Sequence, residues 1–141
     1  MNAPPGEPRT AASRPPWRGQ AVRFSSVGVL NTAVDFGVYF LLTRWLGFAG
    51  LPVTAKGISY GAGIANSYLW NRWWTFRSTD PVRATFPPFV LVNLAGLAIN
   101  AGVMHLALRI IGLPELIALG LATGTAVTWN FAWSKFVVFR T

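Results

Sequence analysis

The sequence has no cysteine and a single histidine, His105. Neither a disulfide framework nor a thiolate metal site is therefore possible, and one histidine does not make a zinc site from protein ligands alone. Acidic residues are also scarce, at four in 141 positions. Three of them fall in the N-terminal tail, a connector and the edge of an apolar segment, so no carboxylate pair is available for glycosyl transfer.

Common catalytic motifs are absent as well. The chain contains no G-x-x-x-x-G-K-[ST] phosphate loop, no H-E-x-x-H and no G-x-S-x-G. We therefore expect a protein that is not an enzyme by itself and that needs no metal or cofactor.

Apolar side chains are abundant: 52% of the residues are hydrophobic and only 11% are charged. About 25% charged residues is usual in a soluble domain. A water-soluble domain of this length would expose too much apolar surface to stay dispersed. The net charge of +8 does not indicate nucleic acid, because the basic residues lie between long apolar runs and form no stripe on a polar face. The composition predicts one integral membrane domain and no nucleic-acid partner.

Residues 1–20 differ from the rest of the chain. They hold five of the ten prolines, several arginines and almost no aliphatic side chains. Such a segment buries too little apolar area to offset its ordering entropy, so we expect a disordered tail followed by a membrane domain at 21–141. The tail lacks the short apolar core of a cleavable signal peptide.

Four segments are long and apolar enough to cross about 30 Å of hydrocarbon as helices. They are 24–46, 53–70, 86–108 and 115–133, and the second and fourth are the richest in glycine and small polar residues. Residues 47–52 and 112–114 are predicted as tight turns, and 77–88 as a longer polar connector. The predicted fold is an all-α membrane protein with four transmembrane helices.

The distribution of basic residues predicts the orientation. Nine of the 12 lie in or beside the tail, the connector and the C-terminus, whereas three flank the two short turns, Arg44, Lys56 and Arg109. Because cytoplasmic loops carry the excess of Lys and Arg, both termini are predicted to be cytoplasmic, with the protein in the cell's inner (plasma) membrane.

The chain also carries an internal similarity between about 22–77 and 86–140. A shift of 65 aligns Phe24 with Phe89 and Asp35 with Asn100, and a shift of 63 aligns Gly57 with Gly120. Each unit holds two spans, so the copies are predicted to be parallel repeats of a helix pair. G-x-x-x-G occurs in both second helices, where it favours close approach of another helix, either static or sliding.

Polar residues inside the predicted spans are the candidate functional groups. Asp35 lies near mid-bilayer, where a charge needs a partner or a wet cavity, and Asn31 is one turn away on the same face. Asp35 is compatible with binding a proton or cation, with accepting hydrogen bonds from a sugar, or with tying helices together. In the second span, a polar stripe follows one face of the helix, with a cation at its outer end: Lys56, Ser59, Gly63, Asn66 and Trp70.

That stripe suits an amphiphile with a phosphate and a hydroxyl-rich head, although Lys56 could simply extend to the outer headgroups. The second unit has Asn100 in place of Asp35 and Leu119 in place of Lys56. It is polar but neutral there, so any ionisable chemistry is expected in the first unit.

The segments RFSSVGVLNTAVDFGVYFLL, KGISYGAGIANSYLWNRWWTFR and WNFAWSKFVVFR resemble the GtrA family of small four-span membrane proteins over about 22–140. The resemblance rests on V-D-F at 34–36 and on N-R-x-W-x-F at 71–76, while Ser134-Lys135 replaces Asn-Arg in the closing segment. It implies translocation of a polyprenyl-phosphate-linked monosaccharide from the cytoplasmic to the outer leaflet, for cell-envelope polysaccharide or glycolipid synthesis. The candidate substrate-binding residues are Asn31, Asp35, Lys56, Ser59, Asn66, Asn71, Arg72, Arg77, Asn100, Asn130 and Lys135.

The expected partners are the polyprenyl-phosphate sugar, bilayer lipids and a second copy of the chain, because four helices enclose little volume. One alternative is a membrane anchor or scaffold that recruits a glycosyltransferase without transport. Another is a small cation exporter with Asp35 as proton carrier. The sequence identifies neither the sugar nor the isoprenoid length.

Overall fold

The computed structural model describes residues 16–140, and these residues form helices and connecting turns with no strand. Four long helices follow one another: α1 (Trp17–Arg44), α2 (Pro52–Trp70), α3 (Val82–His105) and α4 (Glu115–Trp133). Three of these helices continue into a π-helical segment. η2 (Asn71–Thr75) follows α2, η3 (Leu106–Ile111) follows α3, and η4 (Ser134–Val138) follows α4. A 3₁₀ turn, η1 (Phe48–Gly50), joins α1 to α2.

All four predicted spans are helices, and three elements are long and apolar enough to cross a membrane: Trp17–Arg44, Val82–Ile111 and Glu115–Val138. The fourth helix, α2, is 19 residues long and carries Lys56, Ser59, Asn66 and Ser67, which lower its hydropathy. The predicted all-α membrane fold is therefore confirmed as a helical membrane protein with three such helices and a fourth, more polar one.

Two predicted boundaries are wrong. The tail was expected to reach residue 20, but α1 begins at Trp17, and residues 1–15 lie outside the described part of the chain. Pro16 precedes the helix, and its carbonyl accepts a bond from the Gln20 amide at 3.1 Å. Pro16 is thus the N-cap residue of α1, and the helix starts directly after the proline-rich segment.

The connector is shorter than expected, because α3 begins at Val82 and contains Pro87 and Pro88. These prolines remove two amide donors from the second turn. Thr85 and Phe89 are buried on the same segment, at 2% and 0% exposure, and the packing of these side chains offsets the missing bonds.

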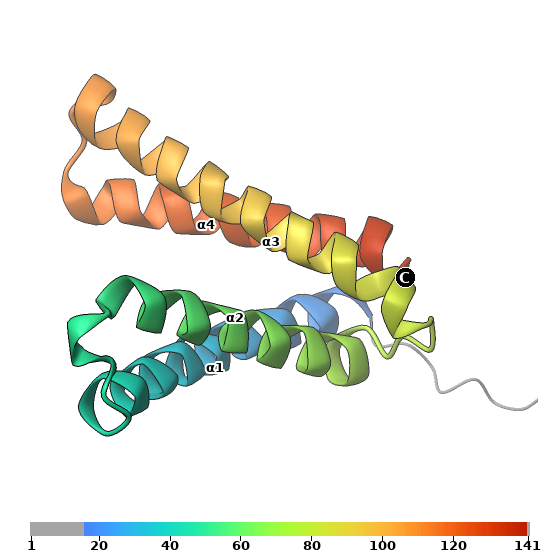
Figure 1. Cartoon of the computed structure of the whole chain (residues 1–141). Coiled ribbons are helices and arrows are strands. Elements are labelled where there is room, and N and C mark those ends of the chain that lie inside the picture. Colours follow the sequence, from blue (N-terminus) through green and yellow to red (C-terminus); the bar gives the residue numbers. More distant parts are fainter. Residues whose placement is uncertain (1–15, 141) are drawn as a thin grey trace, which may run out of the picture.

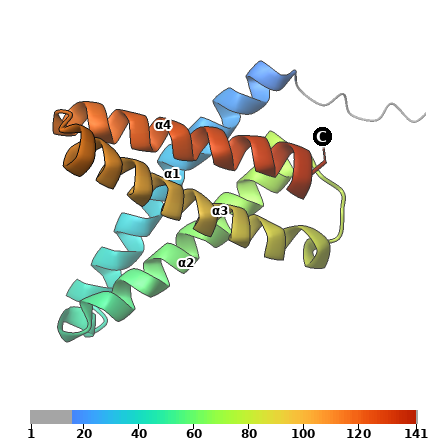
Figure 2. The same ribbon diagram turned by 90° about the horizontal axis from the view of Figure 1, so that it is seen from above.

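The four helices form two antiparallel hairpins, α1 with α2 and α3 with α4 (Figure 1). Within each hairpin the helices pack along most of their length, whereas the hairpins touch each other chiefly at one end. That end holds the start of α1, the end of α2, the start of α3 and the end of α4. The tips of the hairpins splay apart at the other end, and the two hairpins cross at an angle when seen from above (Figure 2).

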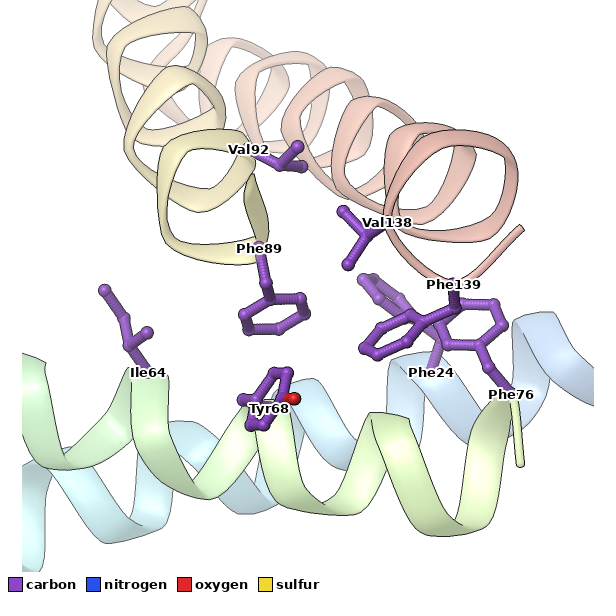
Figure 3. Close-up of a cluster of buried hydrophobic side chains, with 8 residues drawn as sticks. All are labelled: Phe24, Ile64, Tyr68, Phe76, Phe89, Val92, Val138 and Phe139. Atoms are coloured by element: carbon purple, nitrogen blue, oxygen red, sulfur yellow. The ribbon is translucent and has the colours of Figure 1, made fainter. Parts of the chain in front are cut away.

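A cluster of aromatic and aliphatic side chains fills the junction between the hairpins (Figure 3). Phe76 stacks on Phe139 with ring centroids 5.0 Å apart, and Tyr68 meets Phe89 edge-on at 5.4 Å. Aromatic pairs at these separations add to the free energy of simple burial. Phe24 also contacts Phe76, at 6.1 Å, so α1, α2, α3 and η4 all contribute to one core.

The junction core predicts which aromatic side chain stabilises the fold. Phe89→Ala removes a fully buried ring, and large-to-small core changes of this kind cost about 3–5 kcal/mol in soluble proteins. We expect a clear fall in the thermal unfolding midpoint of detergent-solubilised protein. Phe40→Ala is the matched control, since this ring is 54% exposed on α1. Equal midpoints for the two variants would contradict the packing described above.

Candidate functional site

Asp35 lies on α1 and makes two strong contacts with α2. Its Oδ2 accepts a bond from Lys56 Nζ at 2.5 Å, and its Oδ1 accepts one from Ser59 Oγ at 2.6 Å. The carboxylate side chain is 19% exposed and the lysine 55% exposed. Lys56 and Ser59 are three residues apart, so one helical face presents both donors to the same carboxylate. The charge inside the predicted first span is therefore paired within its own hairpin.

A groove of about 670 Å³ opens beside this ion pair, at the splayed end of the molecule. Asp35, Lys56 and Tyr60 line it from the first hairpin, together with Pro52, Val53 and Gly57, and Leu97 of α3 lines it from the second hairpin. The groove thus combines one charged cluster with mainly apolar walls. This arrangement can hold the polar head of an amphiphile while its apolar part stays against lipid.

The middle of the predicted α2 stripe is covered by α1. Ser59 is fully buried, and a Cβ added at Gly63 would lie 3.0 Å from Asn31 Oδ1. Glycine at this position allows the asparagine to approach the helix backbone, and this closes the stripe. Asn66 is half-buried and Trp70 is 45% exposed. The stripe is not an open lane in this structure, and only its outer end reaches the groove.

Arg72 was predicted to bind substrate, but its guanidinium donates to groups of the protein itself. Its Nη1 donates to Tyr68 Oη at 3.3 Å and to Thr85 Oγ1 at 3.2 Å, and its Nη2 donates to the Asp80 carbonyl. The Tyr68 and Thr85 hydroxyls also bond to each other at 2.7 Å. Because Thr85 belongs to α3, these contacts join the two hairpins and the connector.

The neighbouring candidates lie apart from the groove. Asn71 is buried and donates to Ser67 Oγ at 3.2 Å. Arg77 is exposed in the left-handed region, with φ of 50°, which any residue with a Cβ adopts only at a cost. Both residues lie at or after η2, at the junction end of the molecule.

The candidates in the second hairpin do not line the groove either. Asn100 is half-buried on α3, one turn after Leu97. The amide of Asn130 lies directly against Gly96, where any Cβ would collide with it. Lys135 lies over the rings of Phe131 and Phe136, at 6.0 and 5.3 Å. The structure therefore brings Asp35, Lys56 and Ser59 together. Asn100, Asn130 and Lys135 lie away from this cluster.

Sequence reasoning missed Tyr60, Leu97, Tyr68 and Thr85. Tyr60 follows Lys56 by four residues and Tyr68 precedes Arg72 by four, so helical spacing could have found both. No local signal places Leu97 or Thr85, because each faces a helix of the other hairpin.

The G-x-x-x-G glycines do not pack inside the chain. A Cβ added at Gly57, Gly61, Gly120 or Gly124 would meet nothing within 4 Å. A shallow groove of about 600 Å³ crosses the α4 motif, between Gly120, Gly124, Thr128 and Trp133. These small-residue faces are open to another molecule.

Removing one partner of the Asp35–Lys56 ion pair should destabilise the folded protein more than removing both partners. Lys56→Gln leaves a mostly buried carboxylate with one donor, and the expected cost is about 1.5–3 kcal/mol. Adding Asp35→Asn to this variant should restore part of the lost stability. Thermal unfolding of the two single variants and the double variant measures the coupling. Additive effects would show that the pair contributes nothing.

Arg72→Ala should weaken assembly of the two hairpins, because three donor contacts are lost at the junction. Arg77→Ala is the matched control, as an exposed arginine five residues later. We expect a lower unfolding midpoint and faster limited proteolysis in the connector for the first variant alone. Unchanged stability in both would rule out a clamping role for Arg72.

Comparisons with known proteins identify the family of this chain. Residues 23–139 match the family profile described as GtrA/DPMS, transmembrane domain. An uncharacterized membrane protein of Bacillus subtilis (strain 168), YngA, is 39% identical over 120 residues, which cover 83% of this chain and 77% of the relative. The chain therefore belongs to the GtrA/DPMS transmembrane-domain family.

Proposed function

We propose that this protein moves a polyprenyl-phosphate-linked monosaccharide from the cytoplasmic to the outer leaflet, for cell-envelope polysaccharide or glycolipid synthesis. Family membership supports lipid-linked sugar translocation at the level of the family. The observation that carries the proposal is the groove between the hairpins, where the Asp35–Lys56 ion pair, supported by the buried Ser59, lies among apolar walls.

The chemistry of the cluster fits the two parts of such a head group. Lys56 is half-exposed at the groove and can pair with a phosphate. Asp35 can accept hydrogen bonds from sugar hydroxyls, which need polar partners on leaving water, while the buried Ser59 holds the carboxylate in place. The isoprenoid chain remains in lipid along the apolar walls. The head-group site of this proposal contains only first-hairpin residues, and Asn130 and Lys135 are not part of it.

The proposed topology has four spans with both termini in the cytoplasm of the inner (plasma) membrane. It is supported by the start of α1 and the end of α4, which lie at the same end of the molecule (Figure 1). Seven of the basic residues in the described part lie at this end, among them Arg18, Arg23, Arg72 and Lys135. Their position fits a cytoplasmic headgroup boundary.

We further propose that the hairpins are parallel repeats and that the protein acts without enzymatic chemistry of its own. Each hairpin ends in a π-helical segment followed by a phenylalanine and a left-handed arginine, Arg77 and Arg140. This shared detail supports a duplicated unit. The open G-x-x-x-G face of α4, with Gly120 and Gly124, fits a homodimer in which a second copy covers it.

Reconstituted protein should move a polyprenyl-phosphate monosaccharide between leaflets of vesicles. Asp35→Asn and Lys56→Gln should each slow this step, because a lost charged contact is worth about 1.5–3 kcal/mol, or roughly a tenfold loss or more. The measurement is the accessibility of a labelled sugar head to a reagent outside the vesicles. Glu115→Gln and Arg109→Gln are the matched controls, since these charges lie in the other hairpin, outside the groove.

If Asp35→Asn and Lys56→Gln both flip the lipid at the rate of the unaltered protein, the groove is not the head-group site. No flipping by the unaltered protein, together with capture of a glycosyltransferase through the connector, would favour the scaffold alternative. The cation exporter would instead require transport of a cation that Asp35→Asn abolishes.

A further inference from the structure

Polar side chains recur along the facing sides of α1 and of α2 with η2, between apolar ones such as Phe24 and Val27. On α1 the polar residues are Gln20, Asn31 and Asp35, which share one face of the helix, and on α2 and η2 they are Ser59, Asn66, Ser67, Asn71 and Thr75. We call this set the α1–α2 seam. Two contacts join the rows across the interface, Asp35 with Ser59 and Asn31 with Gly63, and η2 packs against α1 beyond them.

Many polar atoms of the seam are buried without a partner among residues 16–140. Seven buried side-chain atoms there lack a hydrogen bond, and five of them belong to the seam: Gln20 Oε1, Asn31 Oδ1, Asn66 Nδ2, Asn71 Oδ1 and Thr75 Oγ1. Buried polar groups in folded proteins are normally satisfied, and each exception calls for an explanation. Here the exceptions follow one interface from its junction end towards the ion pair.

The second hairpin provides the comparison. Its helices meet through small apolar side chains, because Ala118, Ala122 and Ala126 of α4 are buried. Only Asn130 Oδ1 and Ser134 Oγ are buried without a partner there. Unsatisfied buried polar atoms are thus concentrated in the first hairpin, which also carries Asp35 and Lys56.

The unpaired atoms match the chemistry of a sugar. Four of the five are oxygens that accept hydrogen bonds, and the fifth is an amide donor, so together they complement hydroxyl groups, which donate and accept. The seam is uncharged between its ends. Arg23 lies near its junction end, and Lys56 lies at its groove end, so a cation is available for a phosphate at both.

We propose that the sugar head crosses the membrane between α1 and α2, by transient separation of these helices along the seam. This inference rests on the proposed function and adds the route to it. In the closed structure the seam leaves its own polar groups unsatisfied, and a passing head group satisfies them. The α3–α4 hairpin stays closed and serves as the fixed half of the molecule.

A reversible lock tests the route, because the sequence contains no cysteine of its own. A Cβ at Gly63 would lie 3.6 Å from Asn31 Cγ, the atom whose place a cysteine sulfur takes, so a disulfide between the two positions requires only a small adjustment. The test variant is Asn31→Cys with Gly63→Cys. The matched control is Gly96→Cys with Asn130→Cys, which locks α3 to α4 through the corresponding close contact.

Oxidation of the first pair should reduce flipping of a polyprenyl-phosphate monosaccharide to the level of protein-free vesicles, and reduction should return it to the rate that the same double variant shows before oxidation. Oxidation of the control pair should leave flipping unchanged. Flipping that continues with α1 and α2 locked would overturn the route while the proposed function stands. Loss of flipping in both locked proteins would also overturn it, because the second hairpin would then have to move as well.

A second measurement needs no transport. Asn66→Cys and Asn71→Cys should react with a water-soluble thiol reagent in membranes, and added lipid-linked sugar should slow the reaction. Ala122→Cys, buried at 0% exposure in the other hairpin, is the control and should stay unreactive. Seam cysteines as unreactive as this control would overturn the proposal, whatever the flipping assay gives.

Discussion

The aromatic junction between the two hairpins determines the shape of everything else in this molecule. Phe24, Tyr68, Phe76, Phe89 and Phe139 form one core at the end of the molecule where all four helices meet. Arg72, Tyr68 and Thr85 add a polar contact between the hairpins at the same place. Since packing between the hairpins is concentrated there, their tips are free to diverge. The groove beside Asp35 exists because of this divergence.

A membrane environment explains why the polar groups are arranged as they are. A carboxylate in a spanning helix needs a partner, and Lys56 and Ser59 supply it from the next helix. Both donors come from one face of α2, so the contacts with Asp35 stabilise the hairpin. Asp35 and Lys56 also line the groove. The same ion pair therefore has a structural role and a proposed role in binding. Substitutions must be tested for stability and for transport separately.

The two hairpins are alike in outline and different in chemistry. Both end in a π-helical segment, and in both an asparagine packs against a glycine of the facing helix, Asn31 on Gly63 and Asn130 on Gly96. The first hairpin is polar along its interface, whereas the second is lined by alanines. Two similar units with one polar interface suit a division between a moving half and a fixed half.

The sequence by itself determined the helices, the membrane class and the family resemblance, because apolar run length, proline and glycine positions are local properties. It also selected Asp35 and Lys56, since a charge within an apolar run stands out without any knowledge of packing. Only the tertiary structure decided that α1 covers the middle of the α2 stripe, that Arg72 binds Tyr68 and Thr85, and that Leu97 faces the ion pair. These outcomes depend on which helix faces meet, and residues far apart in the chain decide that together.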